Sequence, residues 1–298
     1  FYKPMIKKQS QIMLITGLSG SGKTVALQSL EDLGFYCIDN LSPLMILKMI
    51  EFIQPSKSNL YNKVAISIDI RSIKMDKNFE KSIDKLYFLL KKLNVFVTTI
   101  FLYSEEQILL SRFNATRRLH PLSNNRITLI DALKKEENTM HCLKEKSDLV
   151  IDTTNLKPSE LKNEIKERVS IVQEKKDMSI LIQSFGYKNG LPVNSDFIFD
   201  VRCLKNPFWD KKLRYLSGKN RKVASFLESD KSTVKMENSI ISFIEKWIPN
   251  FSNSDRHYLT ISIGCTGGLH RSVFLAEKVY KYLSLKYTNI LIKHRDSK

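Results

Sequence analysis

The stretch Ile12-Met13-Leu14-Ile15-Thr16-Gly17-Leu18-Ser19-Gly20-Ser21-Gly22-Lys23-Thr24 decides the fold of the first half of this chain. Four apolar residues with strand character lead into the pattern G-x-x-x-x-G-K-[ST], and helix-forming residues follow from Val25. A phosphate-binding loop requires this order of strand, loop and helix, because the helix then points the positive end of its dipole at the anion. A glycine- and serine-rich loop with an incidental lysine is the alternative, and the order of elements argues against it. We therefore predict nucleotide binding at residues 17–24.

The residues of this loop have separate roles in the prediction. Gly17, Gly20 and Gly22 permit backbone torsions that turn several N–H groups toward one anion. Lys23 can reach the β and γ phosphates, and the Thr24 hydroxyl is a suitable ligand for Mg²⁺. The predicted nucleotide-binding residues of the loop are Gly17, Leu18, Ser19, Gly20, Ser21, Gly22, Lys23 and Thr24.

The composition is that of a protein with room for two domains and a strongly basic balance. The chain has 298 residues, 42% of them hydrophobic, and a formal net charge of +17. Such a charge favours polyanionic partners, chiefly nucleic acid, although an AT-biased genome also adds scattered lysines without a partner. The four cysteines have no C-x-x-C or disulfide-framework spacing, so we expect reduced thiols in a cytoplasmic protein. The apolar stretches are too short to span a bilayer and residues 1–8 lack a signal-peptide core, so we expect no membrane partner.

Two carboxylates, Asp39 and Asp69, each follow a short apolar strand in the first half. Parallel strands deliver their C-terminal ends to one edge of a sheet, and an aspartate there resembles the Walker B arrangement that supports Mg²⁺. Asp69 is the predicted Mg²⁺ ligand together with Thr24, and Lys23 and Asp69 would carry catalysis if the protein hydrolyses a nucleotide. Asp39 competes for this role, and an ordinary loop aspartate is the alternative for either.

Arg117 and Arg118 stand on a polar segment after the fourth predicted strand. Two adjacent guanidinium groups there suggest a lid that meets phosphate oxygens. A solvated basic face is the alternative, because the whole chain is basic.

Strands alternate with helices through residues 1–157, which predicts an α/β fold with a mostly parallel sheet in an N-terminal P-loop domain. The charged segment 158–177 is expected to be a helical connection, and residues 178–298 a smaller C-terminal α/β domain. Within it, the pattern predicts a helix over residues 234–247 that ends at Pro249. Residues 211–221 form a basic stretch.

A second strand, glycine-rich loop and helix start occurs at Gly264-Cys265-Thr266-Gly267-Gly268-Leu269-His270-Arg271-Ser272. The same physics predicts a second anion cradle, with His270 and Arg271 as phosphate donors. Cys265 and Arg271 also have the C-x5-R spacing of cysteine-dependent phosphatases. A small apolar residue at a strand end is the alternative for Cys265, and we favour it.

Several segments resemble the RapZ/YvcJ family of bacterial P-loop proteins, described as nucleotide-binding proteins and RNase adaptors. The resemblance covers nearly all of the chain in order. The similar segments are residues 17–24, residues 30–41, Thr116-Arg117-Arg118-Leu119-His120-Pro121-Leu122, Ser184-Phe185-Gly186-Tyr187-Lys188, Asp200-Val201-Arg202, Asn206-Pro207, Trp209, Gly264 to Gly268, His270-Arg271-Ser272 and His294-Arg295-Asp296.

The resemblance implies a kinase-like N-terminal domain that binds ATP or GTP and is at most a weak ATPase or GTPase. It implies that the C-terminal domain presents a small RNA to an RNase, responds in enterobacterial members to glucosamine-6-phosphate, and forms homo-oligomers. A P-loop NTPase or small-molecule kinase without an RNA role is the alternative. The implied site residues are Asp69, Ile70, Arg71 and Ser72 for a second (GTP) segment; Lys188, Arg202, Cys265, Thr266, Gly267, Gly268, His270, Arg271 and Ser272 for phosphosugar or RNA phosphate; and Lys293, His294, Arg295 and Lys298 for an RNA-binding tail.

Three positions depart from the enterobacterial pattern. Asn189 and Phe208 each stand where that pattern has histidine, and the lysine- and arginine-rich run after Asp296 is absent. Because fewer cations then meet phosphates, we expect weaker and less salt-sensitive RNA binding.

Overall fold

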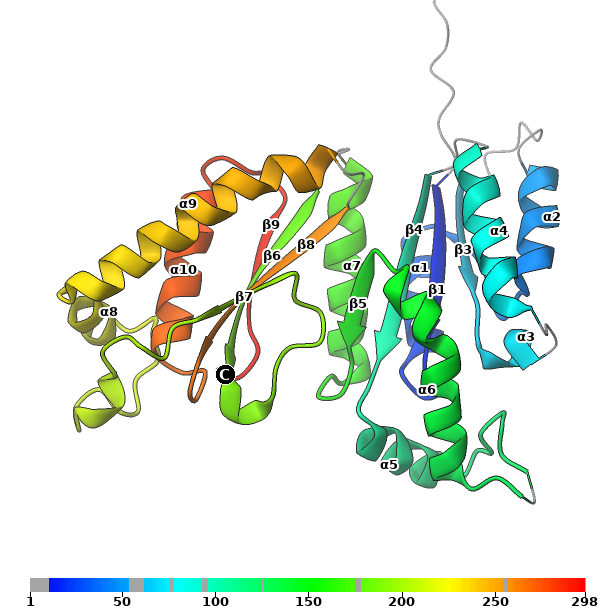
Figure 1. Cartoon of the computed structure of the whole chain (residues 1–298), viewed down its shortest axis with the longest axis horizontal. Helices are drawn as coiled ribbons and strands as arrows, with labels where there is room; N and C mark the ends of the chain where they lie inside the picture. Colours follow the sequence, from blue (N-terminus) through cyan, green and yellow to red (C-terminus); the bar gives the residue numbers. More distant parts are fainter. Residues whose placement is uncertain are drawn as a thin grey trace, which may run out of the picture. The chain divides into compact units, whose positions relative to one another are not determined.

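The computed structural model describes residues 11–53, 62–74, 78–92, 96–124, 126–174, 178–253 and 257–297. The chain divides into two compact units, Phe1–Val169 and Ser170–Lys298. Each unit contains a sheet covered by helices (Figure 1), and every pairing within the two sheets is parallel. The prediction of two α/β parts, with a mostly parallel sheet in the first, is confirmed.

The sheet of the N-terminal unit has five strands in the order β2-β3-β1-β4-β5. The strands are β1 Gln11–Gly17, β2 Tyr36–Ile38, β3 Lys63–Ser67, β4 Phe96–Tyr103 and β5 Leu149–Asp152. Strand β1 is central, and six of its seven residues are buried. Strands buried on both faces require apolar residues at consecutive positions, which explains the unbroken apolar run at the start of the phosphate-loop motif.

The helices of this unit are α1 Lys23–Asp32, α2 Pro43–Ile53, α3 Ile70–Lys74, α4 Phe79–Lys92, α5 Glu106–Thr116, α6 Leu129–Glu145 and α7 Pro158–Glu174, which continues past the division between the units. Helix α4 is amphipathic: its apolar residues Phe79, Ile83, Leu86 and Leu90 recur at helical spacing and are all buried. The short helix α3 directly follows Asp69 and was not predicted, since five residues are too few to show a helical period.

The sheet of the C-terminal unit has the order β7-β8-β6-β9. Its strands are β6 Ser179–Gly186, β7 Phe197–Asp200, β8 Tyr258–Cys265 and β9 Ile290–His294, and its helices are α8 Arg221–Glu228, α9 Lys231–Asn253 and α10 Arg271–Leu283. Two short 3₁₀ helices, η2 Tyr187–Asn189 and η3 Pro207–Trp209, lie in its loops. Because all four strands are parallel, their C-terminal ends meet at one edge of the sheet, where open α/β sheets bind ligands.

The predicted end of the long helix at Pro249 is wrong. Helix α9 begins at Lys231 and continues through Pro249 to Asn253. Proline removes one hydrogen bond, but the helix remains because Ile244 and Ile248 are buried in the core, and burying such side chains stabilises by about 1.5–3 kcal/mol each.

Helix α8 was missed because its first residue closes the basic stretch 211–221. Asn220 caps the helix by accepting a hydrogen bond from the Lys222 backbone N–H, and Val223 and Leu227 are buried one turn apart. No helix in the described ranges combines the length and apolarity that crossing a membrane requires.

Candidate nucleotide and phosphate sites

The first candidate site is the loop between β1 and α1. Strand β1 ends at Gly17 and α1 begins at Lys23, so the helix N-terminus faces the loop. Gly17, Gly20 and Gly22 have φ angles of 136°, 84° and 106°. A Cβ on Gly17 would lie 2.2 Å from the carbonyl oxygen of Leu102, so the neighbouring strand excludes any side chain there. This backbone has the shape that an anion cradle needs.

The Lys23 side chain folds back onto the start of this loop. Its Nζ donates to the carbonyl oxygens of Gly17 at 2.9 Å and Leu18 at 3.0 Å. Burial lowers the pKa of Lys23 below the ordinary lysine value, while the charges of Glu136 and Asp69 act in the opposite direction. An arriving phosphate would replace the two carbonyl contacts with a charge-assisted one and would favour the charged lysine.

Asp69 forms a close pair with Arg71. The Nη2 and Nε atoms of Arg71 lie 2.5 and 2.9 Å from Oδ2 of Asp69, and the Arg71 backbone N–H donates to Oδ1 at 2.8 Å. The Asp69 side chain is 5% exposed and that of Arg71 is 54% exposed. The carboxylate predicted to support Mg²⁺ is therefore already paired with a guanidinium, and the exposed Arg71 side chain could itself turn toward a phosphate.

Asp39 lies at the same sheet edge and has different partners. One of its oxygens accepts the hydroxyl hydrogen of Ser67. The Asn40 backbone N–H donates to Ser67 Oγ at 2.9 Å, and Ser72 Oγ donates to the Asn40 side chain at 2.6 Å. Asp39 is thus bonded to a hydroxyl, whereas Asp69 is bonded to a guanidinium. Both aspartates remain candidates for the Mg²⁺-supporting role.

A metal site made of protein side chains alone is not part of this arrangement. Across the described residues, no three His, Cys, Asp or Glu side chains are placed to hold a metal ion. Mg²⁺ that arrives with a nucleotide takes many of its ligands from phosphates and water. Thr24, exposed in the first turn of α1, fits that role, whereas Asp69 fits only if Arg71 releases it.

Glu136 of α6 holds the loop from behind, and sequence reasoning missed it. The residue is completely buried. Its oxygens accept from the Ser19 backbone N–H at 2.9 Å, from Ser19 Oγ at 2.7 Å and from His120 Nε2 at 2.9 Å. The Leu122 N–H donates to His120 Nδ1 at 3.1 Å, so Nδ1 carries no proton and Nε2 does. The carboxylate therefore receives three hydrogen bonds.

A sequence signal for Glu136 existed. It lies three residues after Leu133 and four before Met140, on the stripe of α6 that is buried. A charged residue on the apolar stripe of a helix is uncommon unless it has partners. Because lysines and another glutamate flank it in the sequence, Glu136 does not stand out as a charged residue on the buried face.

The predicted lid arginines, Arg117 and Arg118, are exposed, and Arg117 ends α5 with a φ of 52°. Another arginine, Arg112, contacts the loop. Its Nη1 donates to the Gly20 carbonyl at 3.0 Å, and its Nη2 donates to the Thr153 carbonyl at 2.6 Å. The lid assignment remains a prediction, and Arg112 is a loop support that the sequence did not single out.

The second candidate site is the loop between β8 and α10. Helix α10 begins at Arg271, so its N-terminus faces the loop as in the first site. Gly268 has a φ of 73°. A Cβ on Gly186, at the end of β6, would lie 2.6 Å from the carbonyl carbon of Gly267, so strand and loop are in close contact. The exposed Lys188 lies beside this loop, and its backbone N–H donates to the Thr266 carbonyl at 3.1 Å.

His270 and Arg271 point to protein groups rather than to an open site. Arg271 is 5% exposed. Its Nη1 donates to the Arg202 carbonyl at 2.7 Å and the Leu204 carbonyl at 2.9 Å, and Nη2 lies 3.3 Å from Thr266 Oγ1. His270 Nε2 lies 3.2 Å from the Leu213 carbonyl, and burial lowers the pKa of His270. Both residues hold the chain between β7 and α8 in place.

Arg202 is paired within its own loop. It donates to Asp200 at 2.7–3.0 Å and lies over the ring of Tyr187, 4.0 Å from the centroid. The hydrogen bonds from Arg202 hold the pKa of Asp200 below its usual range. Arg202 is half exposed, so it can still meet a phosphate.

The described residues of the predicted tail are bound into the fold. His294 contacts Ser184 Oγ at 2.8 Å and Glu277 Oε1 at 3.0 Å, and burial lowers its pKa. Arg295 donates to the Gly190 carbonyl at 2.8 Å and to that of Asn189 at 3.2 Å. Lys293 is half-buried in β9, and Lys298 lies outside the described residues. The structure thus gathers most of the predicted C-terminal residues at one sheet edge, but as a packed network.

Cys265 has the surroundings of a core residue. It is 3% exposed and belongs to the hydrophobic core of its unit. Its Sγ lies 3.1 Å from Ser272 Oγ. The Arg271 guanidinium donates to two backbone carbonyls, so it is not placed to hold a phosphate over the sulfur. The geometry favours the apolar alternative over a phosphatase nucleophile.

We expect Cys265 to resist thiol reagents in the folded protein, while the exposed Cys203 reacts at once. Burial excludes the reagent, so Cys265 should react only as fast as its unit unfolds. Mass spectrometry of iodoacetamide-labelled peptides over time measures both rates. Cys265→Ser should retain any phosphatase activity of the preparation. Labelling of Cys265 as fast as that of Cys203 would contradict this assignment.

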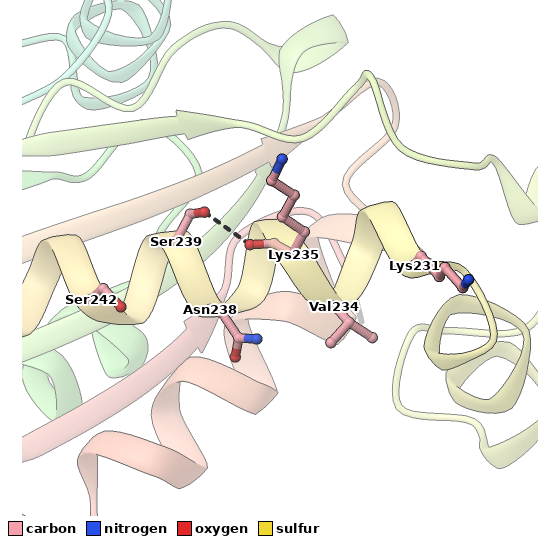
Figure 2. Close-up of a pocket in the computed structure, with 6 residues that line it drawn as sticks. All are labelled: Lys231, Val234, Lys235, Asn238, Ser239 and Ser242. Carbon is pink, nitrogen blue, oxygen red and sulfur yellow. Dashed lines mark hydrogen bonds between the residues drawn. The ribbon is translucent and has the colours of Figure 1, made fainter.

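An open hollow also lies along α9 (Figure 2), lined by Lys231, Val234, Lys235, Asn238, Ser239 and Ser242. These residues come from one helix, and Ser239 Oγ donates to the Lys235 carbonyl of the preceding turn at 2.9 Å. None of the predicted site residues lines it. We assign no function to it.

Comparison with known proteins covers both units. Residues 10–173 match the family described as RapZ-like N-terminal domain, and residues 178–298 match the family described as RapZ C-terminal domain. The chain is 42% identical over 288 residues to a protein of Marinobacter nauticus named "Nucleotide-binding protein", covering 96% of both chains. It is 40% identical over 286 residues to a protein of the same name from Hahella chejuensis, covering 96% of this chain and 99% of that one.

Among solved structures, a shikimate kinase from Bacteroides thetaiotaomicron matches with a TM-score of 0.36 and 14% identity. The match covers 56% of this chain and 99% of that one.

Proposed function

Because this chain belongs to the RapZ family over both of its units, we propose that it binds ATP or GTP at residues 17–24 and binds RNA through its C-terminal unit. The observation that carries the first part is the phosphate loop, in which three glycines with positive φ precede a helix N-terminus and Lys23. RNA binding through the C-terminal unit would make the protein a cytoplasmic adaptor that presents a small RNA to an RNase.

The nucleotide proposal is supported by a loop that is held in shape before any ligand binds. Glu136 bonds the backbone of Ser19, and Arg112 bonds the Gly20 carbonyl. A preorganised loop spends less binding energy on ordering its backbone. The relatives from Marinobacter and Hahella are named nucleotide-binding proteins. The loop does not distinguish adenine from guanine, because it contacts phosphates.

Thr24 and Asp69 are the proposed protein ligands of the Mg²⁺ that accompanies the nucleotide. This ion would supply charge neutralisation between the β and γ phosphates. In the rest of the second nucleotide segment, Ile70 is buried, Ser72 bonds Asn40, and the exposed Arg71 side chain can reach a phosphate. Slow hydrolysis through Lys23 and Asp69 is compatible with this arrangement.

Lys23→Ala tests the nucleotide site. Losing a charge-assisted contact of about 1.5–3 kcal/mol should weaken ATP or GTP binding by about 10- to 100-fold. Isothermal titration measures the change, and phosphate release from both nucleotides measures hydrolysis. Lys48→Ala is the matched control, because Lys48 is an exposed lysine on α2 of the same unit. Wild-type affinity and phosphate release in Lys23→Ala would exclude the phosphate loop as the site.

The RNA proposal is supported by the net charge of +17 and by the cations at the C-terminal edge of the second sheet. Lys188 and Arg202 are exposed or half exposed there. Cations that meet phosphates release counterions and give salt-dependent binding. A labelled small RNA that stays free with micromolar protein at about 50 mM salt would contradict the proposal. RNA crosslinked in the source cell would identify the target.

The second cradle is the proposed site of a phosphosugar effector such as glucosamine-6-phosphate. Thr266 is exposed, Gly267 is half-buried, and Lys188 lies beside them. Asn189, where enterobacterial members have histidine, is exposed in η2 and offers an amide instead. We further propose that the chain forms homo-oligomers. An NTPase or small-molecule kinase without an RNA role is the alternative, and the RNA-binding measurement separates it.

A further inference from the structure

The C-terminal unit exposes three large aromatic side chains on one short segment. Trp209 is 77% exposed, Tyr215 is 85% exposed and Phe208 is 44% exposed. Single exposed apolar residues are normal on protein surfaces, but adjacent exposed aromatics mark binding sites. Phe208 and Trp209 contact each other edge to face, with ring centroids 5.7 Å apart.

Buried side chains and hydrogen bonds anchor this segment to the rest of the unit. Pro207 and Leu213 are buried, and the Asn206 side chain accepts the Phe208 N–H at 3.2 Å. His270 contacts the Leu213 carbonyl at 3.2 Å, and the Gly218 N–H donates to the Leu269 carbonyl at 2.8 Å. The fold therefore fixes a loop whose largest side chains remain in solvent, directly beside the second cradle.

The chain around these aromatics is strongly basic, although one of its lysines, Lys219, pairs with Glu277. Residues 205–222 contain seven lysines and arginines and one acidic residue, Asp210. Arg214 lies over the ring of Phe208, with its guanidinium carbon 4.7 Å from the centroid, and its Nε donates to the Phe208 carbonyl at 3.1 Å. Aromatic faces interleaved with cations match a ligand that alternates flat bases with phosphates.

We propose that Phe208, Trp209, Arg214 and Tyr215 form a platform on which unpaired bases of RNA stack, beside the phosphate cradle at residues 264–272. This rests on the RNA binding proposed above and specifies its ligand as single-stranded. Stacked bases inside an A-form duplex do not present their faces to a protein, so the platform reads loops and ends rather than stems. Lys211, Lys212 and Lys222 then meet the backbone phosphates.

Trp209→Ala and Tyr215→Ala test the platform. Stacking contributes about 1–3 kcal/mol per base, so each variant should weaken binding of a labelled single-stranded RNA about 5- to 100-fold. The dependence of affinity on salt should stay as in wild type, and binding of a fully paired duplex should not change. Trp209→Phe, which keeps an aromatic face, should restore most of the loss. Lys222→Ala is the matched charge control, and it should lower the salt slope by about one for both RNAs.

Fluorescence gives a second readout, because Trp209 and Trp247 are the two tryptophans of the chain. In a Trp247→Phe protein, single-stranded RNA should quench the remaining Trp209 emission. Wild-type affinity in both alanine variants, with RNA binding otherwise intact, would overturn the platform and leave the adaptor proposal standing. Failure of the wild-type protein to bind either RNA would overturn both. A change of oligomeric mass in Trp209→Ala, measured by light scattering, with unchanged RNA affinity would assign the surface to a second copy of this chain and also overturn the platform.

Discussion

Glu136→Ala is expected to lower the free energy of unfolding of the N-terminal unit by about 3 kcal/mol or more and to weaken nucleotide binding. The carboxylate accepts two hydrogen bonds from Ser19 and one from His120, all in the interior. Without it, these donors lose their acceptor, at about 1–3 kcal/mol for each buried group left unpaired. Nucleotide affinity falls in parallel, because Ser19 is part of the phosphate loop.

Glu136→Gln separates hydrogen bonding from packing volume. The amide oxygen of glutamine can keep the two donors that share Oε2, the Ser19 backbone N–H and His120 Nε2. The amide NH₂ then meets the Ser19 hydroxyl, which can turn its hydrogen away and accept. We therefore expect glutamine to destabilise the unit less than alanine does, because it weakens these hydrogen bonds but leaves no donor without an acceptor.

Unfolding in urea followed by far-ultraviolet circular dichroism measures these changes. Both tryptophans belong to the C-terminal unit, so their fluorescence reports that unit separately and should show an unchanged transition. Glu137→Ala is the matched control, because Glu137 is the exposed neighbour on the same helix. A Glu136→Ala protein as stable as Glu137→Ala would show that the buried network contributes nothing.

Arg271→Ala is expected to destabilise the C-terminal unit by about 3 kcal/mol. The carbonyls of Arg202 and Leu204 lose their donor, the Thr266 hydroxyl loses a partner, and a buried side chain leaves a cavity. Tryptophan fluorescence during urea unfolding measures the loss. Arg271→Lys should recover only part of it, since one ammonium cannot reproduce the fork of a guanidinium.

The comparison with Lys188→Ala distinguishes an anchor from a phosphate contact. Lys188 is exposed beside the same loop. Its removal should therefore weaken RNA binding, while the unfolding transition stays as in wild type. Arg271→Ala should lower both, because the chain between β7 and α8 is released. If Arg271→Ala weakens ligand binding with no change in stability, Arg271 is a phosphate donor, as the motif alone suggested.

The local patterns of this chain predicted the features that depend on local physics. Residues 12–24 specify strand, loop and helix within a few positions, because glycine torsions and the helix dipole act over that distance. The alternation of apolar strands and helices was enough for two α/β parts with a parallel sheet. The end of helix α9 was predicted wrongly at Pro249, because the burial of Ile248 outweighs the one hydrogen bond that proline removes.

Local patterns could not predict which groups the site residues hydrogen-bond. Glu136 contacts Ser19 across 117 positions and Arg271 contacts Arg202 across 69, and no local spacing encodes such distances. Arg271 was predicted as a phosphate donor because its motif shows the charge, while the carbonyls that it satisfies come from a distant loop. The sequence therefore predicted where the phosphate loop lies and that it binds a nucleotide. Packing decided which charged side chains are buried supports and which remain free for a ligand, since burial depends on every element that closes over a residue.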